Sequence, residues 1–247
     1  MSKRFEGRIA VVTGASRGIG YFTARALAAE GAHVVAIART VGGLEELDDE
    51  IRAAGGQATL VPVDLTDYEA IDRLGAALYE RWKKLDILIG NAGILGGLSP
   101  LGHVDPKTWD KVMAINVTAN WRLIRSLDPL LRQSDAGRVL FMSSGAAHKC
   151  KAYWGPYSVS KAAVEALVRT YSAETRQTPV TSMLVNPGPM RTAMRAEAMP
   201  GEDPETLAHP SEIAPFMLDL VSPTNTANGQ LFDYPSKEIR DFVQVTS

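Results

Sequence analysis

The feature of this chain that most constrains its fold is a regular alternation of short apolar segments with longer amphipathic ones. The short segments are continuously apolar and rich in β-branched residues, which is typical of strands in a parallel sheet covered on both faces. Strands are expected at residues 9–12, 33–38, 59–63, 87–90, 138–143 and 180–185, with a seventh near residues 230–233. Helices are expected at residues 19–30, 44–54, 69–82, 108–131 and 157–176.

Alternating strands and helices build right-handed βαβ units. The sequence therefore predicts the α/β class: a doubly wound parallel sheet of about seven strands between two helical layers, a three-layer α/β/α sandwich. Neither a linker nor a repeat nor a low-complexity segment divides the 247 residues, so one domain is expected to span residues 1–247.

Charge and cysteine content exclude several classes of function. The chain has 26 Lys and Arg against 28 Asp and Glu, a net charge of −2, which does not suit a nucleic-acid footprint or a basic membrane patch. A single cysteine, Cys150, excludes an internal disulfide and a multi-cysteine metal site. The N-terminal segment has no long apolar region, and the apolar runs elsewhere are too short to span a bilayer. A cytoplasmic protein without nucleic-acid or membrane partners is expected.

Residues 13–20, TGASRGIG, follow the first expected strand and open the first expected helix, which is the setting of a nucleotide-binding turn. Gly14 would permit the sharp turn, Gly18 would let the backbone approach a pyrophosphate, and Gly20 would let the helix pack close to the sheet. The helix N-terminus would offer its N–H groups to phosphate. No G-K-[ST] closes the turn, so no lysine reaches a terminal phosphate, and an ATPase or kinase is excluded.

Tyr157 and Lys161 lie four residues apart in an expected helix, which places them on one face. An ammonium beside a phenol should lower the tyrosine pKa from about 10, and such a tyrosine can exchange a proton with a carbonyl or alcohol oxygen. Ser144 precedes Tyr157 by thirteen residues, at the end of the fifth expected strand. A Tyr-x-x-x-Lys pair also occurs by chance on ordinary helices, and a strand-end serine can simply cap a turn. The interpretation as a site therefore depends on the motifs occurring together.

In this order, the motifs resemble those of the short-chain dehydrogenase/reductase family over residues 5–232. TGASRGIG is similar to its T-G-x-x-x-G-x-G turn, GNAG at residues 90–93 to its N-N-A-G motif, and YSVSK to its Tyr-x-x-x-Lys pair. The chain looks closest to the acyl-carrier-protein-reductase-like branch and to poorly characterised bacterial oxidoreductases, through GNAGILG and RTAMRA at residues 191–196. That similarity names no substrate.

The resemblance implies a Rossmann-type fold and hydride transfer between a nicotinamide cofactor and a carbonyl or secondary alcohol. Tyr157 would be the acid or base, Ser144 would hold the substrate oxygen, and Lys161 would lower the tyrosine pKa and hold the nicotinamide ribose. Asn116 would hold a water that links Lys161 to solvent. The expected cofactor-binding residues are Gly14, Ser16, Arg17, Gly18, Ile19, Gly20, Arg39, Asp64, Leu65, Asn91, Ala92, Gly93, Tyr157, Lys161, Pro187, Gly188 and Thr192.

Some residues depart from the family pattern or have a second interpretation. Gly90 stands where the family has asparagine, and because Asn91 remains, only a small local effect is expected. Asp64, expected at the adenine, could instead cap its own loop, and Asn116 could be a helix-bending amide. The tail at residues 231–247 lacks the glycines of the family's V-D-G-G turn, so the tail's oligomer contacts are not carried over.

The residues after the second expected strand favour NADP(H) over NAD(H). Family members that prefer NAD place an aspartate at the end of that strand, to bind the ribose 2′-hydroxyl. Here the position is Ala38, Arg39 follows it, and Arg17 lies in the glycine turn. No carboxylate would repel a 2′-phosphate and two guanidiniums could bind it, although Arg39 could also be a solvated loop residue.

Residues 187–215 interrupt the alternation with six prolines and three methionines. Loops of this length are usually functional, and the position after a strand's carboxyl end suits a substrate lid. The methionines, together with Arg191 and Arg195, would suit a carbonyl compound with an acidic or thioester-linked tail. The methionines are Met190, Met194 and Met199.

His148 and Cys150 are interpreted as rim residues, because zinc needs three or four ligands and this chemistry needs no metal.

Two other functions stay open. One is a cofactor-binding sensor on the same fold, against which the complete Ser–Tyr–Lys set argues. The other is an epimerase or dehydratase, whose relatives usually have a larger C-terminal domain and a G-x-x-G-x-x-G turn. A homodimer or homotetramer is expected, since the helices at residues 108–131 and 157–176 form the family's dimer interface. Small residues on the second helix would permit close approach: Ala162, Ala163 and Ala166.

Overall fold

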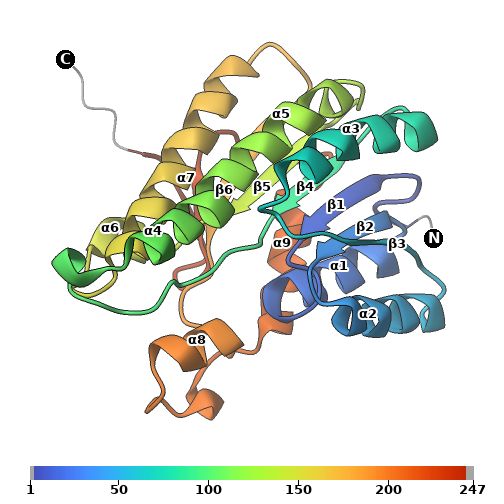
Figure 1. The fold of residues 1–247 in the computed structure, drawn as a ribbon. Helices are drawn as coiled ribbons and strands as arrows, with labels where there is room; N and C mark the ends of the chain where they lie inside the picture. Colours follow the sequence, from blue (N-terminus) through green and yellow to red (C-terminus); the bar gives the residue numbers. More distant parts are fainter. Residues whose placement is uncertain (1–2, 243–247) are drawn as a thin grey trace.

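In the computed structural model, which describes residues 3–242, eight strands form one sheet in the middle of the molecule, in the order β3-β2-β1-β4-β5-β6-β7-β8 (Figure 1). Neighbouring strands are parallel except that β8 runs antiparallel to β7. The predicted α/β class and doubly wound sheet are confirmed, with one strand more than expected. The strands are β1 (Ile9–Thr13), β2 (His33–Ala38), β3 (Gln57–Pro62), β4 (Ile87–Gly90), β5 (Arg138–Met142), β6 (Thr181–Asn186), β7 (Leu231–Asp233) and β8 (Glu238–Arg240).

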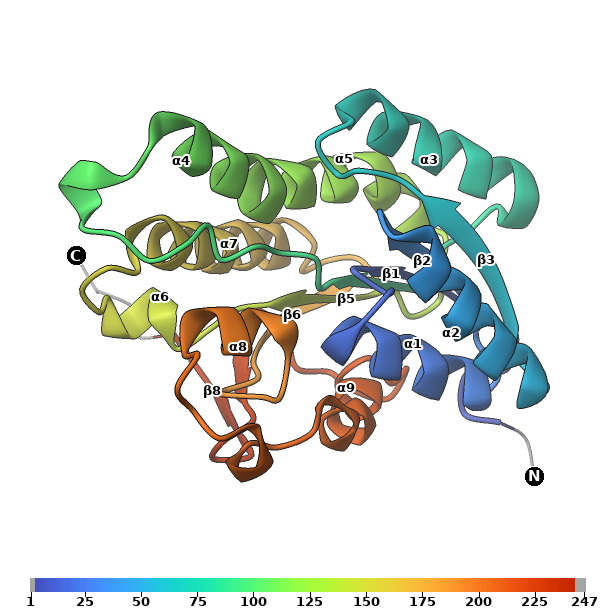
Figure 2. The same ribbon diagram turned by 60° about the horizontal axis from the view of Figure 1, so that its bottom comes forward.

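Helices cover both faces of the sheet, which gives the predicted three layers (Figure 2). One face carries α1 (Gly18–Ala29), α2 (Val41–Ala53) and α9 (Ala214–Leu220). The other carries α3 (Tyr68–Trp82), α4 (Pro106–Met113), α5 (Ala119–Leu131) and α7 (Gly155–Glu174). Short elements complete the fold: η1 (Leu101–His103), α6 (Ala146–Lys149), α8 (Ala193–Ala198), η3 (Pro204–Thr206) and η4 (Pro210–Glu212).

Local sequence signals explain where several helices begin. The side chain of Asp67 accepts a hydrogen bond from the Ala70 amide and caps α3, and Asp105 caps α4 in the same way from the Thr108 amide. Pro106 then occupies the first turn of α4, where its missing N–H costs nothing. These caps place α4 two residues earlier than the apolar pattern indicated.

The predicted continuous helix at residues 108–131 is wrong in one respect. A π-helical segment, η2 (Ala114–Thr118), separates α4 from α5. Such insertions often mark functional positions, and this one contains Asn116. The cause is tertiary: the Asn116 side chain bonds the backbone of Ile94 in the loop after β4. An apolar periodicity carries no signal for that contact.

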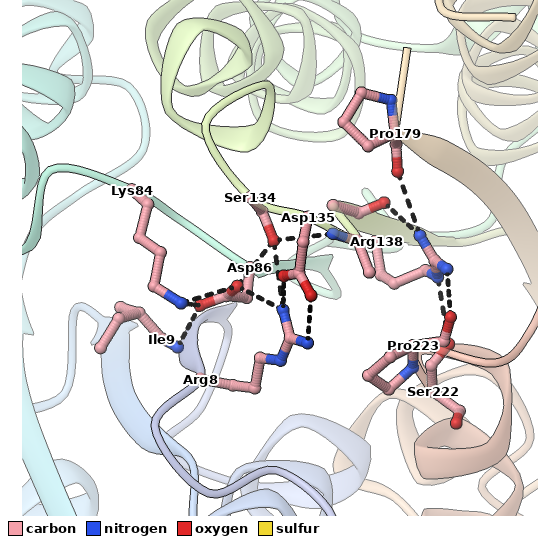
Figure 3. A network of polar contacts seen from close by, with 12 residues as sticks. Arg8, Ile9, Lys84, Asp86, Ser134, Asp135, Arg138, Pro179, Ser222 and Pro223 are labelled. Carbon is pink, nitrogen blue, oxygen red and sulfur yellow. Dashed lines mark hydrogen bonds and ion pairs between the residues drawn. The ribbon is translucent and has the colours of Figure 1, made fainter.

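A polar network joins the amino ends of β1, β4 and β5 (Figure 3). The glycine turn lies at the opposite, carboxyl end of β1. The buried Asp86 carboxylate accepts hydrogen bonds from the Ile9 amide at 2.9 Å, Arg8 at 2.8 Å and Ser134 at 2.6 Å. Burial raises the pKa of Asp86, but these hydrogen bonds more than offset it and hold the pKa below its usual value. The charged form is therefore the one that the fold stabilises.

Replacing Asp86 with alanine should destabilise the fold by about 3 kcal/mol, because it leaves Arg8 and Lys84 without their buried partner. The folded-state pKa of Asp86 is depressed, so its stabilisation is present above the unfolded pKa of about 3.9 and is lost as the pH falls through the folded pKa. Urea unfolding at pH 7 and at pH 3 measures both effects.

Asp219→Ala is the matched control, since Asp219 forms an exposed pair with Arg4. Its loss should cost under about 1 kcal/mol. Equal losses in the two variants at pH 7 would contradict the role assigned to the network.

Candidate active site

The strand order reverses between β1 and β4, because the chain first builds β2 and β3 on one side and then returns to build β4 to β8 on the other. In open α/β sheets, ligands bind at such a switch point, outside the carboxyl ends of the strands. A cleft of about 780 Å³ opens there. Its walls come from the turn after β1, the loops that follow β2 to β6, and the segments of α7 and α8. Apart from Gly20 and Asn116, every predicted site residue lines this cleft.

The glycine turn is locked to the end of β4 by Asn91 and Thr13. The Asn91 side chain donates to the Thr13 carbonyl at 2.9 Å and to the Gly14 carbonyl at 3.2 Å, and the Thr13 hydroxyl accepts from the Asn91 amide at 3.0 Å. A Cβ on Gly14 would lie 2.7 Å from Asn91 Nδ2, and one on Gly20 only 2.4 Å from it. The two glycines are therefore required for close packing, and Gly20 lies behind the turn.

The first turn of α1 has the properties of an anion site. Gly18 adopts a positive φ of 60°, which L-residues other than glycine rarely adopt. Arg17 precedes the helix without capping it by its side chain, so the first N–H groups of α1 are available to a ligand. Ser16, Arg17, Gly18 and Ile19 all line the cleft. These residues fit the diphosphate of a dinucleotide.

The carboxyl end of β2 also lines the cleft. The strand ends at Ala38, and Arg39, which follows it, forms an exposed ion pair with Asp64 at 3.6 Å. Asp64 also accepts hydrogen bonds from the Thr66 amide and hydroxyl, so it caps its own loop as the second interpretation had it. Burial raises the pKa of Asp64, but Thr66 and Arg39 outweigh it and hold the pKa below its usual value. An exposed pair of this kind holds Arg39 weakly, which leaves its guanidinium available.

Ser144, Tyr157 and Lys161 meet at one wall of the cleft. Ser144 follows β5, and the other two lie on one face of α7, 8% and 4% exposed. The Lys161 ammonium donates to the Met142 carbonyl at 2.7 Å and lies 5.6 Å from the centroid of the Tyr157 ring. The phenol, the ammonium and the hydroxyl are thus brought together in one cleft, as the spacing predicted.

The predicted depression of the Tyr157 pKa is wrong for this arrangement. Burial raises the pKa of Tyr157, and the Ser144 hydroxyl only partly opposes it. Burial also lowers the pKa of Lys161 to about 8, while the carboxylate of Glu165 acts in the opposite direction. In water the ammonium would lower the pKa of the phenol, whereas here the loss of hydration dominates the pKa values of both groups.

Asn116 does not line the cleft, and its role in holding a water stays a prediction. Its Oδ1 accepts from the Ile94 amide at 2.9 Å, and its Nδ2 donates to the Ile94 carbonyl at 2.9 Å and to Ser160 Oγ at 3.0 Å. Both amide hydrogens are therefore used within the protein, and the side chain is fully buried. Asn116 holds the loop after β4 against α7, next to Lys161.

Gly90 has more than a small local effect. A Cβ at this position would lie 2.1 Å from the ring of Phe141 on the neighbouring strand β5. The glycine and the phenylalanine are thus a packing pair, and an asparagine in place of Gly90 would require Phe141 to move.

Residues of the 187–215 segment, the predicted lid, line one side of the cleft. Pro187, Gly188 and Thr192 line it, and the Thr192 hydroxyl caps α8 by accepting from the Arg195 amide at 3.2 Å. A Cβ on Gly18 would lie 3.6 Å from Thr192 Cγ2, so the lid reaches the glycine turn. Met194 and Met199 pack against a small apolar cluster that includes Tyr157, Leu95, Trp154 and Ala198.

The sequence interpretation missed three residues that shape the site. Trp154 stands edge-on to Tyr157 with 5.9 Å between ring centroids. Asn186, at the end of β6, accepts from the Gly145 amide at 3.0 Å and from the Gly188 amide at 3.2 Å, and so joins two loops of the cleft. Its place directly before Pro187 could have indicated this.

The third is Glu165, a buried carboxylate one turn beyond Lys161 on α7. It accepts a hydrogen bond from Ser143 at 2.5 Å and pairs with His148 Nε2 at 3.1 Å. A glutamate four residues after the lysine, among apolar neighbours, was the available signal. His148, expected at the rim, is the half-exposed partner of this carboxylate.

The fold and the cleft are those of a Rossmann-type α/β protein with a glycine turn at the switch point of its sheet. The family model described as short chain dehydrogenase matches residues 8–203. The chain belongs to the short-chain dehydrogenase/reductase family and is an oxidoreductase of that family.

Individual relatives cover nearly the whole chain. The uncharacterized oxidoreductase YciK of Escherichia coli is 36% identical over 230 residues, which are 92% of this chain and 91% of YciK. A short chain dehydrogenase from Pseudomonas syringae is 38% identical, with a TM-score of 0.91 and coverage of 95% of this chain and 97% of that one. A short chain dehydrogenase from Shigella flexneri, solved in complex with NADP, is 36% identical, with a TM-score of 0.91 and coverage of 95% and 100%.

Glu165→Gln should lower the pKa of Lys161 below about 8, because the carboxylate that raises it is removed while burial still lowers it. The measurement is a pH titration of the Lys161 Nζ resonance by lysine side-chain ¹⁵N NMR. Glu174→Gln, an exposed position on the same helix, is the control and should leave this titration unchanged. A Lys161 pKa that is the same in both variants would show that Glu165 does not act on the ammonium.

Proposed function

We propose that this protein transfers a hydride between NADP(H) and a carbonyl or secondary alcohol. One observation carries the proposal: Ser144, Tyr157 and Lys161 share a cleft with a glycine turn and two guanidiniums, those of Arg17 and Arg39. The first three residues suit proton exchange with a substrate oxygen, and the others suit the phosphates of a dinucleotide.

The bound cofactor supplies the hydride in reduction and accepts it in oxidation. Ser144 holds the substrate oxygen by a hydrogen bond. Tyr157, whose pKa is raised by burial, is protonated near neutral pH and donates its proton to that oxygen. Lys161, held by the Met142 carbonyl, then stabilises the phenolate, since an ammonium with a pKa of about 8 is mostly charged at pH 7. In oxidation the phenolate accepts the proton of the alcohol.

Asn116 supports this step as a positioning residue, through the hydrogen bonds of its side-chain amide. By its bonds to Ile94 and Ser160 it fixes the loop after β4 against the helix turn that carries Lys161.

Tyr157→Phe should lower kcat by about 10²–10⁴-fold, because it removes the proton donor and leaves the apolar ring in place. The affinity for NADPH, measured by fluorescence titration, should stay close to that of the wild type. Tyr153→Phe is the matched control, an exposed tyrosine four residues earlier that does not line the cleft. Near-normal turnover by the Tyr157 variant would overturn the assignment.

NADP(H) is the proposed cofactor on three grounds. No carboxylate ends β2, Arg17 and Arg39 both line the cleft, and the relative from Shigella flexneri was solved with NADP. A guanidinium binds phosphate through charge-assisted, often bidentate hydrogen bonds.

Arg39→Gln should raise the KM for NADPH by about tenfold, which corresponds to the loss of one charge-assisted hydrogen bond of about 1.5 kcal/mol. The KM for NADH should change little, since NADH has no 2′-phosphate. Steady-state kinetics with both cofactors measures this split. Arg25→Gln is the control, because Arg25 is exposed on α1, pairs with Glu50 and does not line the cleft. Equal changes for NADPH and NADH would refute the role of Arg39.

A homodimer or homotetramer that forms through α5 and α7, acting on a small-molecule substrate in the cytoplasm, completes the proposal. Exposed Trp121 on α5 and Val159 on α7 support it, as do the exposed Ala162 and Ala166 on α7. Within residues 3–242, no helix combines the length and apolar character needed to cross a membrane.

A further inference from the structure

The cleft carries a charge opposite to that of the chain. The net charge of the whole chain is −2, yet seven of the residues that line the cleft are Lys or Arg and one is Asp. A concave site lined by one sign of charge concentrates ligands of the opposite sign. The seven cations are Arg17, Arg39, Lys149, Lys151, Lys161, Arg191 and Arg195, and the acidic residue is Asp64.

The two lid arginines are already neutralised. Arg191 forms two hydrogen bonds with Glu205, at 2.8 and 3.0 Å, and Arg195 forms two with Glu202, at 2.5 and 2.6 Å. Both glutamates belong to the lid itself. These bidentate pairs hold the lid together, so the lid guanidiniums are poor candidates for binding a substrate anion.

Lys149 and Lys151 are different. Neither forms an ion pair with a carboxylate anywhere in residues 3–242. The stem of Lys149 lies over Gly145, with its Cε 3.7 Å from the place that a Cβ would take there. Gly145 directly follows Ser144, so this lysine belongs to the catalytic end of the cleft. Lys151 follows in the same segment, three residues before Trp154.

An apolar wall lies at the same end of the cleft. Leu95, Trp154, Met194 and Met199 form a cluster with the buried ring of Tyr157. A substrate that reaches the tyrosine hydroxyl therefore passes an apolar surface, while two unpaired ammoniums stand at the rim.

We propose that Lys149 and Lys151 bind an anionic group of the substrate, so that the substrate is an apolar carbonyl or alcohol compound with a carboxylate or phosphate away from the reacting carbon. The proposal rests on hydride transfer at Tyr157 and names the substrate class of that same site. An ammonium at the rim and an apolar wall beside Tyr157 would select against both neutral and small polar carbonyl compounds.

Binding without turnover tests the anion site directly. The wild type, saturated with NADPH, is titrated with octanoate, octyl phosphate and octanol, which share one apolar chain. We expect at least one anion to bind on the order of tenfold tighter than octanol at low salt, and the difference to shrink at high salt. The two anions distinguish a carboxylate from a phosphate as the natural group.

The double variant Lys149→Gln/Lys151→Gln should bind the preferred anion no better than octanol, with its affinities for octanol and NADPH unchanged. Lys107→Gln/Lys111→Gln is the matched control, because it changes the net charge equally at two exposed lysines of α4 that do not line the cleft. This control should bind the anion as the wild type does. Equal affinities of the wild type for octanol and both anions would overturn the proposal. So would a variant that loses NADPH affinity and keeps anion affinity, since the lysines would then serve the cofactor.

Turnover separates this proposal from the one on which it rests. NADPH oxidation is followed with 8-oxooctanoate and with its methyl ester, and the acid should have a kcat/KM on the order of tenfold higher, a preference that the double variant loses. Equal rates for acid and ester would refute the anion site alone. Tight anion binding with no oxidation of NADPH by either aldehyde would refute hydride transfer and leave the anion site standing.

Discussion

The hydrogen bonds between Thr13 and Asn91 hold the site together, because they join the two strands between which the sheet reverses its order. The glycine turn leaves β1 at this junction, and the loop that Asn116 secures leaves β4 there. The side-chain amide of Asn91 also occupies the space that a side chain at Gly14 or Gly20 would need. The close approach of α1 to the sheet and the opening of its N-terminus toward the cleft are therefore consequences of one contact.

The wall of the cleft that carries Tyr157 and Lys161 disfavours the charged forms of both side chains. Burial by itself disfavours the charged forms of both Lys161 and Tyr157, because the protein interior solvates a charge less well than water does. The fold compensates with fixed polar partners: the Met142 carbonyl for the ammonium, and Glu165, itself held by Ser143. A buried cation with only a carbonyl and a nearby carboxylate responds strongly to a charge that forms next to it, because few water molecules screen it.

Much of the fold could be predicted because β1, β2, β4, β5 and β6 are largely buried apolar runs, and the apolar pattern of a sequence reports burial. The pattern could not show β8, whose three residues are exposed at the edge of the sheet, nor the interruption at Asn116, which depends on a bond to the distant Ile94. The position of Ser144, Tyr157 and Lys161 in one cleft followed from spacing and topology. Their pKa values did not, since these depend on how much water the surrounding chain removes.

The lid illustrates why charge in a sequence does not identify charge in a site. Arg191 and Arg195 stood beside methionines in a segment that suited substrate binding, yet each is paired with a glutamate of that segment. Lys149, in a short helix after Ser144, has no such partner in the described chain, and its stem lies along the backbone beside that serine. Both arginine pairs are bidentate and join residues within the lid, so they fix its shape. Under the proposed substrate class, the segment after β5 would select the anionic group and the lid would select the apolar body.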